Sequence, residues 1–349
     1  MKRRNFIATL GATLMIPTAC KMRGLGTESA SASVAGKELL LPRALRPGDA
    51  VGYITPATYV SDPDLLGRAD RNLKNFGLKP KFGKSVGKHS GYLGGSIDER
   101  LDDLHGMFRD PEIRGIFAVR GGYGSGQLLD RIDYDLIRKN PKAFVGYSDI
   151  TALHLAINKH AGLVTFHGPV GISTFPDYTK DYFRKAVFQS TPIGNVANRP
   201  GHPARIIRPG KATGRLIGGN LSLVCELMGT PYEIDTRDKI LFLEDTSEEP
   251  FRIDRMLTQL RLAGKFKDAA GIVFGECAGC KPNECAPAFG ASFTVSEVAD
   301  QLFGNLNIPV ISGLTIGHTE DQITLPQGIM ATLDGDHGEL RIDEAAVRA

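Results

Sequence analysis

Short apolar runs and amphipathic segments alternate along the chain from Asp49 onward, a pattern typical of strands that are followed by helices. In the first part of the chain, strands are expected at 51–55, 115–119, 143–146 and 163–166. Ser96 and Glu99 have the spacing of a capping box, so a helix is expected after Ser96. A second helix is expected from about Asp149 to His160. This order predicts an α/β fold with a largely parallel sheet.

The same alternation returns near Gly214 and predicts a second α/β unit. Strands are expected at 214–220, 240–243, 271–274, near 310 and at 329–333, and helices at 221–228, 251–262 and 295–303. Residues 171–211 contain five prolines and few sustained apolar runs, which predicts a long connection. We therefore expect an N-terminal domain over 45–170 and a C-terminal domain over 212–349, joined by 171–211.

The first 19 residues have a different character from the rest of the chain. They contain Lys2, Arg3 and Arg4 and no acidic residue, so they account for the whole net charge of +3. An apolar stretch and small residues follow in the order of an export signal, and Arg3-Arg4 resembles the twin-arginine pattern. The sequence thus predicts a signal over 1–19 and export to the periplasm or cell envelope; the alternative is a basic N-terminus on a cytosolic protein.

Cys20 stands where a lipidated cysteine would follow the signal. Pro17-Thr18-Ala19-Cys20 resembles a bacterial lipoprotein cleavage site, although that pattern usually has an aliphatic residue in place of Pro17. Two outcomes remain open, a lipid anchor on Cys20 or cleavage and release. Residues 20–44, rich in Ser, Ala and Gly over 24–36, are expected to form a flexible tether.

Composition narrows the class of protein. Hydrophobic residues make up 42% and charged residues 23% of the 349 residues, which excludes a disordered chain. From residue 20 onward, 39 basic and 39 acidic side chains balance, which argues against nucleic acid as a partner. A run of 18 apolar residues is absent from the sequence, so a membrane-spanning helix is not expected.

A glycine cluster from Arg120 to Gly126 follows a predicted strand. Its spacing fits neither a dinucleotide fingerprint, which would need glycine in place of Gln127, nor a P-loop. Two interpretations remain open at this point. In the first, backbone amides that the glycines leave without internal partners face an anionic or oxyanionic group. In the second, the cluster is only a tight turn between a strand and a helix.

Three side chains are candidates for hydrolytic chemistry. Ser148 stands between a strand and a helix, where a hydroxyl projects from a sharp turn, but Ile150 interrupts the full nucleophile-elbow pattern and a helix N-cap is the alternative. Glu244 follows an apolar strand, and it either acts in a site or caps a helix. His318 lies in a predicted loop, where it is either a general base or simply solvated.

The patterns for metal or redox chemistry are weak. His154, His160 and His167 are spaced by 6 and 7 residues, which does not match zinc ligands on one helix face. Cys277, Cys280 and Cys285 lack a fourth ligand at suitable spacing, and a disulfide among them is an alternative. We therefore expect no metal and no cofactor, and we interpret the cysteine segment as a surface loop without a catalytic role.

Several segments occur in an order that resembles the LD-carboxypeptidases, a family of serine peptidases that includes microcin-immunity peptidases. The resemblance covers roughly residues 45–330, and the set of motifs is more specific than any one of them. The matching segments are Tyr92-Leu93-Gly94-Gly95, Arg120-Gly121-Gly122-Tyr123-Gly124, Gly146-Tyr147-Ser148-Asp149, Phe166-His167-Gly168-Pro169, Gly218-Gly219-Asn220-Leu221, Leu243-Glu244-Asp245 and Ile316-Gly317-His318.

The resemblance implies a flavodoxin-like N-terminal domain, a C-terminal swivelling β/α domain and an active site in the cleft between them. It implies that Ser148 is the nucleophile, His318 the base and Glu244 the acid of a triad without a metal. The backbone amides of Gly122 and Asp149 would then form the oxyanion hole.

Arg120, Arg215 and Asn220 are candidates for substrate binding because they lie in or near these motifs, and Arg120 and Asn220 are preferred. The chain departs from many relatives at Thr319, where they have a second glycine. The resemblance also allows a homodimer.

The function that the resemblance implies is release of the terminal D-alanine from tetrapeptide stems of peptidoglycan, so that a muropeptide is the expected partner. An amidase of the same family that acts on a peptidyl-nucleotide antibiotic is one alternative. A non-catalytic envelope protein that binds muropeptides is another.

Overall fold

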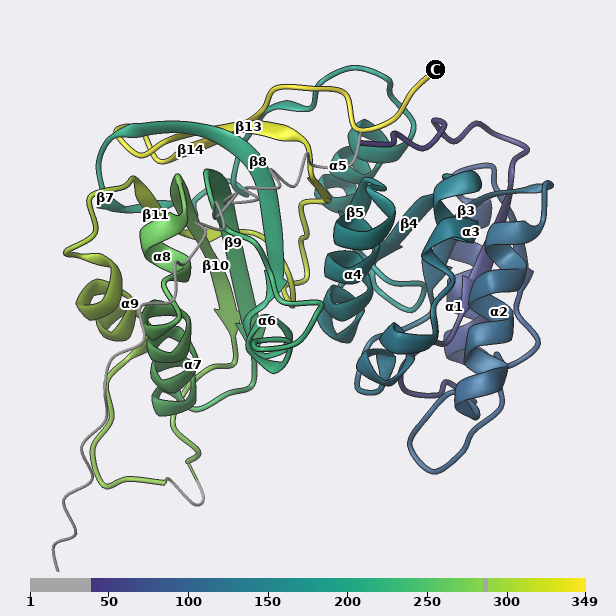
Figure 1. Ribbon diagram of the computed structural model, residues 1–349, viewed down its shortest axis with the longest axis horizontal. Coiled ribbons are helices and arrows are strands. Elements are labelled where there is room, and N and C mark those ends of the chain that lie inside the picture. The colour runs from purple at the N-terminus through teal and green to yellow at the C-terminus, as the bar shows by residue number, and fades with distance from the viewer. Residues whose placement is uncertain (1–38, 285–287) are drawn as a thin grey trace, which may run out of the picture. The chain divides into compact units, whose positions relative to one another are not determined.

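The first predicted unit folds around a six-stranded sheet in the computed structural model, which describes residues 39–284 and 288–349 (Figure 1). Its parallel strands lie in the order β5-β4-β3-β1-β2, the flavodoxin-like order. They are β1 (Ala50–Ile54), β2 (Lys79–Phe82), β3 (Ile113–Ala118), β4 (Ala143–Gly146) and β5 (Thr165–His167). From the C-terminal part of the chain, β12 (Leu325–Gln327) joins β5 in antiparallel pairing. The predicted α/β fold is confirmed.

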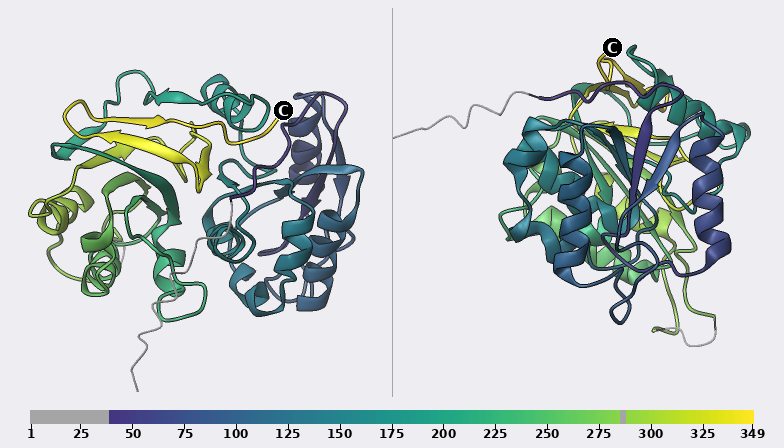
Figure 2. Two further views of the ribbon diagram at one scale, coloured as in Figure 1. Left: turned by 45° about the horizontal axis from the view of Figure 1, so that its top comes forward. Right: turned by 90° about the vertical axis from the view of Figure 1, so that its right-hand side faces the viewer.

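Helices cover both faces of this sheet (Figure 2). They are α1 (Pro63–Lys74), α2 (Ile97–Arg109), α3 (Tyr134–Lys139), α4 (Thr151–Ala161) and α5 (Asp177–Val187), with short 3₁₀-helices η1 (Ser125–Arg131) and η2 (Ser148–Ile150). The predicted capping box of Ser96 and Glu99 begins α2. Strand residues alternate between the two apolar layers: Ile54 packs in the layer of α2 and α4, and Tyr53 in the layer of α1 and α5.

The second unit is an eight-stranded sheet in the order β6-β14-β13-β8-β9-β10-β11-β7. Its central strands β8 (Lys211–Asn220), β9 (Lys239–Thr246), β10 (Gly271–Ala278) and β11 (Val310–Leu314) are parallel. The outer strands β6 (Gly194–Val196), β7 (Arg205–Arg208), β13 (Met330–Asp334) and β14 (Glu339–Ile342) pair antiparallel. The helices of this unit are α6 (Leu221–Glu226), α7 (Pro250–Leu262), α8 (Lys265–Asp268) and α9 (Val295–Phe303).

Helix α4 lies between the two sheets and contacts both β5 and β8 (Figure 1). Eight of its 11 residues are buried, and only the polar stretch 158–160 near its C-terminus reaches solvent. It ends at Gly162, whose φ of +69° is the left-handed conformation common at helix C-termini. Because α4 directly follows Ser148, this buried helix ties the Ser148 turn to the second sheet.

Two segments expected to be connecting chain contain packed structure. Residues 171–211 carry α5 and the edge strands β6 and β7. Residues 39–44, in the predicted tether, also pair with the folded unit: Leu40 forms a bridge with Leu163, and Ala44 is buried and donates to the carbonyl of Arg348. The predicted signal and Cys20 lie outside the described residues. Among the helices described, none is long and apolar enough to cross a membrane.

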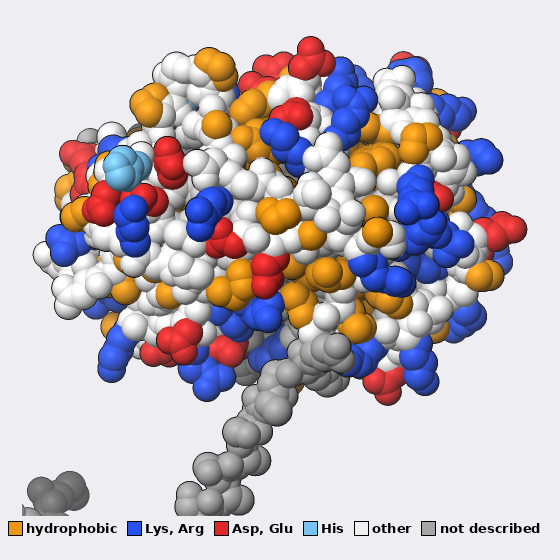
Figure 3. Space-filling model, turned by 90° about the horizontal axis from the view of Figure 1, so that it is seen from above, with side chains coloured by type: hydrophobic (Ala, Val, Ile, Leu, Met, Phe, Trp, Pro, Cys, Tyr) orange, Lys and Arg blue, Asp and Glu red, His pale blue; other side chains and the backbone are white. Residues whose placement is uncertain are grey.

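Charges of both signs are interspersed over the face shown in Figure 3. An ion pair of 2.7 Å between Lys211 and Asp334 joins the neighbouring strands β8 and β13. Another, of 2.6 Å, joins Arg341 to Asp343, two residues further along the chain. This distribution agrees with the balance of charge from residue 20 onward.

Candidate active site

Three side chains from distant parts of the chain meet in one hydrogen-bonded row. Ser148 Oγ lies 3.1 Å from Nε2 of His318, and Nδ1 of the same ring lies 2.8 Å from Oε2 of Glu244. Ser148 follows β4, Glu244 lies within β9, and His318 lies in the loop after β11. The structure therefore brings together the three residues that the resemblance indicated.

Ser148 adopts a backbone conformation that is unusual for a residue other than glycine. Its φ is +65°, and such a conformation in an L-residue costs about 1–2 kcal/mol. The strand before it turns sharply into η2, and Gly121 packs so closely that a Cβ there would lie 2.8 Å from Cβ of Ser148. Because its hydroxyl meets His318 and makes no cap hydrogen bond, the N-cap alternative for Ser148 is wrong.

The two carboxylates of β9 point to different partners. Glu244 is fully buried and faces His318, and burial raises its pKa although the hydrogen bond from His318 acts in the opposite direction. Asp245 instead accepts hydrogen bonds from the amide and hydroxyl of Ser222 at the start of α6, at 2.9 and 2.8 Å. Alternation along the strand separates their roles, so only Glu244 belongs to the row with Ser148.

His318 is held from two sides. The ring of Tyr147, next to Ser148, packs edge-on against the imidazole with centroids 4.8 Å apart. Behind the histidine, Gly317 has a φ of +83° and lies directly against the Glu244 carboxylate. The loop itself is closed by a hydrogen bond of 3.0 Å from the amide of Ile323 to the carbonyl of Thr315.

Gly317→Ala is expected to disturb the carboxylate of Glu244, because a Cβ at this position would overlap Oε2 and must displace it from Nδ1 of His318. Gly313→Ala is a matched control, since Gly313 has a φ of +82° and open space around its Cβ position. Both variants should lose about 1–2 kcal/mol of stability from the positive φ, but only Gly317→Ala should also lose hydrolytic activity. Thermal unfolding and kcat/KM of both variants test this; equal activity would contradict it.

The glycine cluster forms a turn beside Ser148. Gly122 and Gly124 have φ of +106° and +122°, which explains the need for glycine there. The carboxylate of Asp149 accepts hydrogen bonds from the amides of Gly124 and Ser125 at 3.3 and 2.8 Å, so it ties this turn to the residue after Ser148. Among the residues described, the amide of Gly122 has no hydrogen-bond partner. The glycine cluster is therefore a tight turn that also contains a backbone amide without a hydrogen-bond partner.

Arg100 is a buried support of this turn that sequence reasoning missed. It is 1% exposed, and its guanidinium donates to the carbonyls of Pro56 and Gly124, each at 2.8 Å. Burial lowers its pKa. The sequence feature that could have identified Arg100 as buried is its place beside Leu101 and Leu104, the apolar positions of α2.

The two preferred candidates for substrate binding differ in their surroundings. Arg120 is half-buried beside Tyr147 and forms no hydrogen bond or ion pair with any described residue. Asn220 is 3% exposed, donates from Nδ2 to Asp245 at 3.2 Å and accepts at Oδ1 from the amide of Leu223 at 3.3 Å. Oδ1 of Asn220 therefore caps α6 and Nδ2 is bound to Asp245, so of the two candidates only Arg120 has a free polar group.

Two buried histidines lie behind the row. His154 on α4 is fully buried and hydrogen-bonds through Nε2 to the carbonyl of Gly146 at 2.8 Å. Burial lowers its pKa from 6.5 to about 4. Burial also lowers the pKa of His167 on β5 well below its ordinary value. Both side chains are therefore neutral at pH 7.

This burial predicts a loss of stability in acid. Between pH 6.5 and 4 the unfolded chain binds a proton at His154 that the folded chain does not, so the free energy of unfolding falls as the pH falls. The loss from this residue is expected to reach about 3 kcal/mol near pH 4. Urea unfolding at pH 7 and 5 should show a smaller loss in His154→Gln, which keeps an N–H for Gly146 but does not titrate. The exposed His202→Gln variant should keep the wild-type loss.

The expectation of a surface loop is wrong for Cys277, which lies in strand β10, whereas Cys280 follows that strand. Cys277 lies on β10 opposite Asp245, and Cys277, Cys280 and Cys225 are free thiols. Cys20 and Cys285 lie outside the described residues. In the described part of the chain, no group of three or more His, Cys, Asp or Glu side chains is arranged to hold a metal ion.

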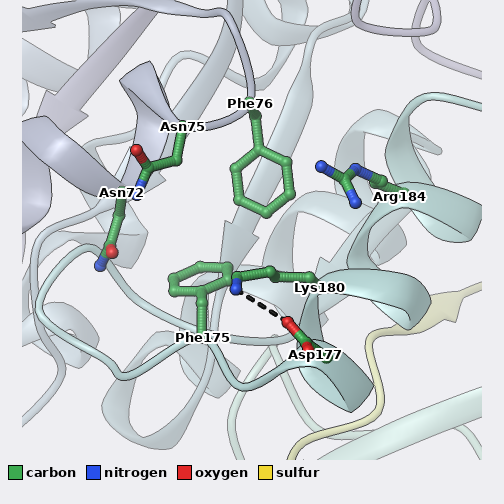
Figure 4. A pocket seen from close by; sticks show the side chains of 7 residues that line it. All are labelled: Asn72, Asn75, Phe76, Phe175, Asp177, Lys180 and Arg184. Carbon is green, nitrogen blue, oxygen red and sulfur yellow. Dashed lines mark hydrogen bonds and ion pairs between the residues drawn. The ribbon is translucent and has the colours of Figure 1, made fainter.

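A pocket of about 490 Å³ lies between α1 and α5 (Figure 4). Its residues are Asn72, Asn75, Phe76, Phe175, Asp177, Lys180 and Arg184. Lys180 pairs with Asp177 at 3.0 Å, and Arg184 lies over the ring of Phe76 at 5.2 Å. The lining therefore offers neither a hydroxyl or thiol side chain nor a histidine, in contrast to the row at Ser148.

Known proteins resemble both halves of this chain. The profile of the LD-carboxypeptidase N-terminal domain matches residues 51–168, and that of the C-terminal domain matches residues 213–333. A probable murein peptide carboxypeptidase of Bacillus subtilis strain 168 is 44% identical over 299 residues, which cover 84% of this chain and 91% of that protein. The microcin C7 self-immunity protein MccF of Escherichia coli is 31% identical over 338 residues, 87% of this chain and 96% of that protein.

Solved structures agree with these relatives. The muramoyltetrapeptide carboxypeptidase of Oxalobacter formigenes superposes with a TM-score of 0.73 at 31% identity, covering 86% of this chain and all of that chain. A structure of MccF in complex with aspartyl sulfamoyl adenosine superposes with a TM-score of 0.80 at 28% identity, covering 88% of this chain and all of that chain. Both domain profiles, the fold and the relatives together show that this chain belongs to the LD-carboxypeptidase family of serine peptidases.

Proposed function

We propose that this chain releases the terminal D-alanine from peptidoglycan tetrapeptide stems, with Ser148 as nucleophile, His318 as base and Glu244 as the orienting acid. The observation that carries the proposal is the hydrogen-bonded row from Ser148 Oγ through His318 to Glu244, at 3.1 and 2.8 Å. The names of the murein peptide carboxypeptidase relatives support the substrate class.

The geometry supports an acyl-enzyme mechanism. Nε2 of His318 takes the proton of Ser148 as Oγ attacks the carbonyl carbon between the diamino acid and D-alanine. Glu244 accepts the Nδ1–H and stabilises the imidazolium. His318 then gives the proton to the nitrogen of D-alanine, which leaves as the C–N bond breaks. A water, deprotonated by His318, hydrolyses the ester on Ser148 and restores the enzyme.

The oxyanion of the tetrahedral intermediate needs donors that are in place before the reaction. In this proposal they are the amides of Gly122 and Asp149. The free amide of Gly122 supports this assignment, and so does the Asp149 carboxylate, which ties the glycine turn to the Ser148 turn. Losing one such donor typically costs about 10²–10³ in rate.

The test is incubation of the protein with a muropeptide tetrapeptide, followed by mass spectrometry. The proposal expects loss of one alanine in the wild-type reaction and none in Ser148→Ala. Binding of the stem peptide without any turnover would favour the non-catalytic binding protein instead.

The likeness to MccF favours one competing substrate class, a peptidyl or aminoacyl nucleotide, because that protein has been solved with aspartyl sulfamoyl adenosine. The same triad chemistry applies to any acyl group on an amide nitrogen. Comparing kcat/KM for the tetrapeptide and for an aminoacyl sulfamoyl adenosine decides between the two. A higher value for the nucleotide would overturn the peptidoglycan assignment.

Arg120 is proposed to bind the free carboxylate of the substrate, since its guanidinium lies beside Tyr147 and has no partner among the described residues. Arg120→Met is expected to raise KM about 10–100-fold with a smaller change in kcat. Arg120→Lys should recover part of the loss. A tetrapeptide with an amidated C-terminus is the matched control, because its KM should not respond to either substitution.

Export remains a proposal that rests on the sequence of residues 1–20, which lie outside the described residues. Cell fractionation tests whether the chain reaches the periplasm or envelope, and a twin lysine in place of Arg3-Arg4 should retain it in the cytoplasm. Radiolabelled fatty acid should enter the wild-type protein but not Cys20→Ala if Cys20 is lipidated. Release of an unlabelled mature protein would support cleavage without an anchor.

A further inference from the structure

His167 is a fully buried histidine that the mechanism above leaves unused. It ends β5, where its backbone pairs with Gly146 on one side and with Leu325 on the other. Its ring packs against the rings of Tyr147 and Phe242, with centroids 6.2 and 5.3 Å away. Neither ring nitrogen has a hydrogen-bond partner within the described residues. Leaving a buried polar group unpaired is costly, so an apolar ring would be favoured here if packing were the only need.

A second unpaired atom faces this histidine. Oε2 of Glu244 is occupied by His318, whereas Oε1 is buried and has no hydrogen-bond partner among the described residues. The side-chain amide of Asn220, opposite Glu244 on β8, is the other donor that acts on this carboxylate, and it lowers the Glu244 pKa. Nε2 of His167 lies 3.8 Å from Oε1. An ionised carboxylate only accepts hydrogen bonds, so a donor is the group that suits Oε1.

Burial and two neighbouring histidines favour the neutral form of His167. The titratable groups that face it are Glu244 from β9, His154 from α4, His318 from the loop after β11, and Tyr147. Burial is the main cause that lowers the pKa of His167, and both neighbouring histidines act in the same direction. A neutral imidazole has one N–H, and an imidazolium in this place would compete with His318 for the charge of Glu244.

We propose that His167 is a positioning residue for the triad: its Nε2–H is directed at Oε1 of Glu244 and holds the carboxylate so that Oε2 faces Nδ1 of His318. The inference deepens the proposed mechanism and rests on it. His167 touches neither the substrate nor Ser148 in this scheme, and it acts through the orientation of Glu244. It also gives the Phe166-His167-Gly168-Pro169 motif a chemical role besides strand pairing.

Two substitutions separate positioning from packing. His167→Gln keeps an N–H donor near the place of Nε2, whereas His167→Phe keeps a flat ring without a donor. We expect His167→Phe to lose about tenfold in kcat with little change in KM, because the N–H that faces the charge on Oε1 of Glu244 at 3.8 Å is removed. The acid limb of its pH–kcat/KM profile should move to higher pH, because the Glu244–His318 pair then holds its proton more tightly.

His167→Gln is expected to retain more activity than His167→Phe and to keep the acid limb near its wild-type position. The reverse order, or a His167→Phe enzyme with wild-type kcat and pH profile, would overturn the proposal. Circular dichroism and thermal unfolding of both variants establish that the comparison is made on folded protein.

The role of His167 can also be tested on the wild-type protein, so that the test does not depend on whether the variants fold. In ¹⁵N-histidine NMR spectra of the wild-type protein, His167 should be the neutral Nε2–H tautomer from pH 8 down to 5. A protonated ring, or a proton on Nδ1 instead, would overturn the proposal. Reaction of Ser148 with a fluorophosphonate reports triad assembly without a peptide. Labelling without cleavage of any stem peptide would therefore count against the proposed substrate and leave the role of His167 standing.

Discussion

Replacing Ser148 with alanine is expected to lower kcat by about 10⁶-fold, the size of effect seen when the nucleophile of a serine triad is removed. Ser148 Oγ is the only atom of the row placed to attack a carbonyl, and His318 at 3.1 Å then has no hydroxyl to deprotonate. KM should change little, because alanine leaves the surrounding groups in place. Alanine release from the tetrapeptide, measured by mass or by a coupled amino-acid assay, gives the rate.

The control for this variant is Ser222→Ala. Ser222 is a half-buried serine that bonds to Asp245, the carboxylate next to Glu244, but it does not reach His318. It should keep kcat within a few-fold of wild type. Calorimetric binding of the tetrapeptide to Ser148→Ala then shows whether the substrate still binds. Wild-type turnover in Ser148→Ala would remove this residue from the mechanism.

Replacing Glu244 with glutamine should lower kcat by about 10⁴-fold without unfolding the protein. Glutamine has the same shape, but its amide N–H₂ does not accept the Nδ1–H of His318 as the carboxylate does at 2.8 Å. The imidazole then favours the tautomer with its proton on Nε2, which is unable to take the proton of Ser148. Because burial raises the pKa of Glu244, a neutral side chain suits the site, and stability at pH 7 should not fall.

Glu233→Gln makes the same chemical change at a surface ion pair with Lys265, 2.6 Å long, and is expected to leave kcat unchanged. A pH series of unfolding adds a second check on Glu244. A carboxyl whose folded pKa is raised stabilises the protein at low pH and loses that contribution as the pH rises through its folded pKa. This dependence should disappear in Glu244→Gln. An equal slope in both proteins would contradict the burial of an ionisable group there.

The strands of both cores were predictable because they are buried on both faces. Segments such as Ala143–Gly146 and Ile240–Leu243 are continuously apolar, which is the pattern of central strands in parallel sheets. The short edge strands β6 and β7 lack such a pattern, since water covers part of each. Their partners, such as Val196 with Leu340 and Arg208 with Val310, lie more than 100 residues away.

The sheet that strand β12 joins was also not predictable from the sequence. Residues 325–327 come from the C-terminal half but complete the first sheet beside β5, where Leu325 faces His167. Local propensity does not report which sheet a three-residue strand will join. The pairing is selected by the packing of the two halves around α4.

By itself, the sequence determined the α/β class and two sheets through its apolar periodicity, and it identified Ser148, Glu244 and His318 through motifs that resemble a known family. Only the tertiary structure decided that Ser148 and Glu244, respectively 170 and 74 residues from His318, lie within hydrogen-bond distance of one imidazole. The same holds for Asp149 and the glycine turn, and for His167 behind Glu244. The physical reason is that hydrogen bonds require positions within about 3 Å, and such positions across distant segments are set by how the whole core packs.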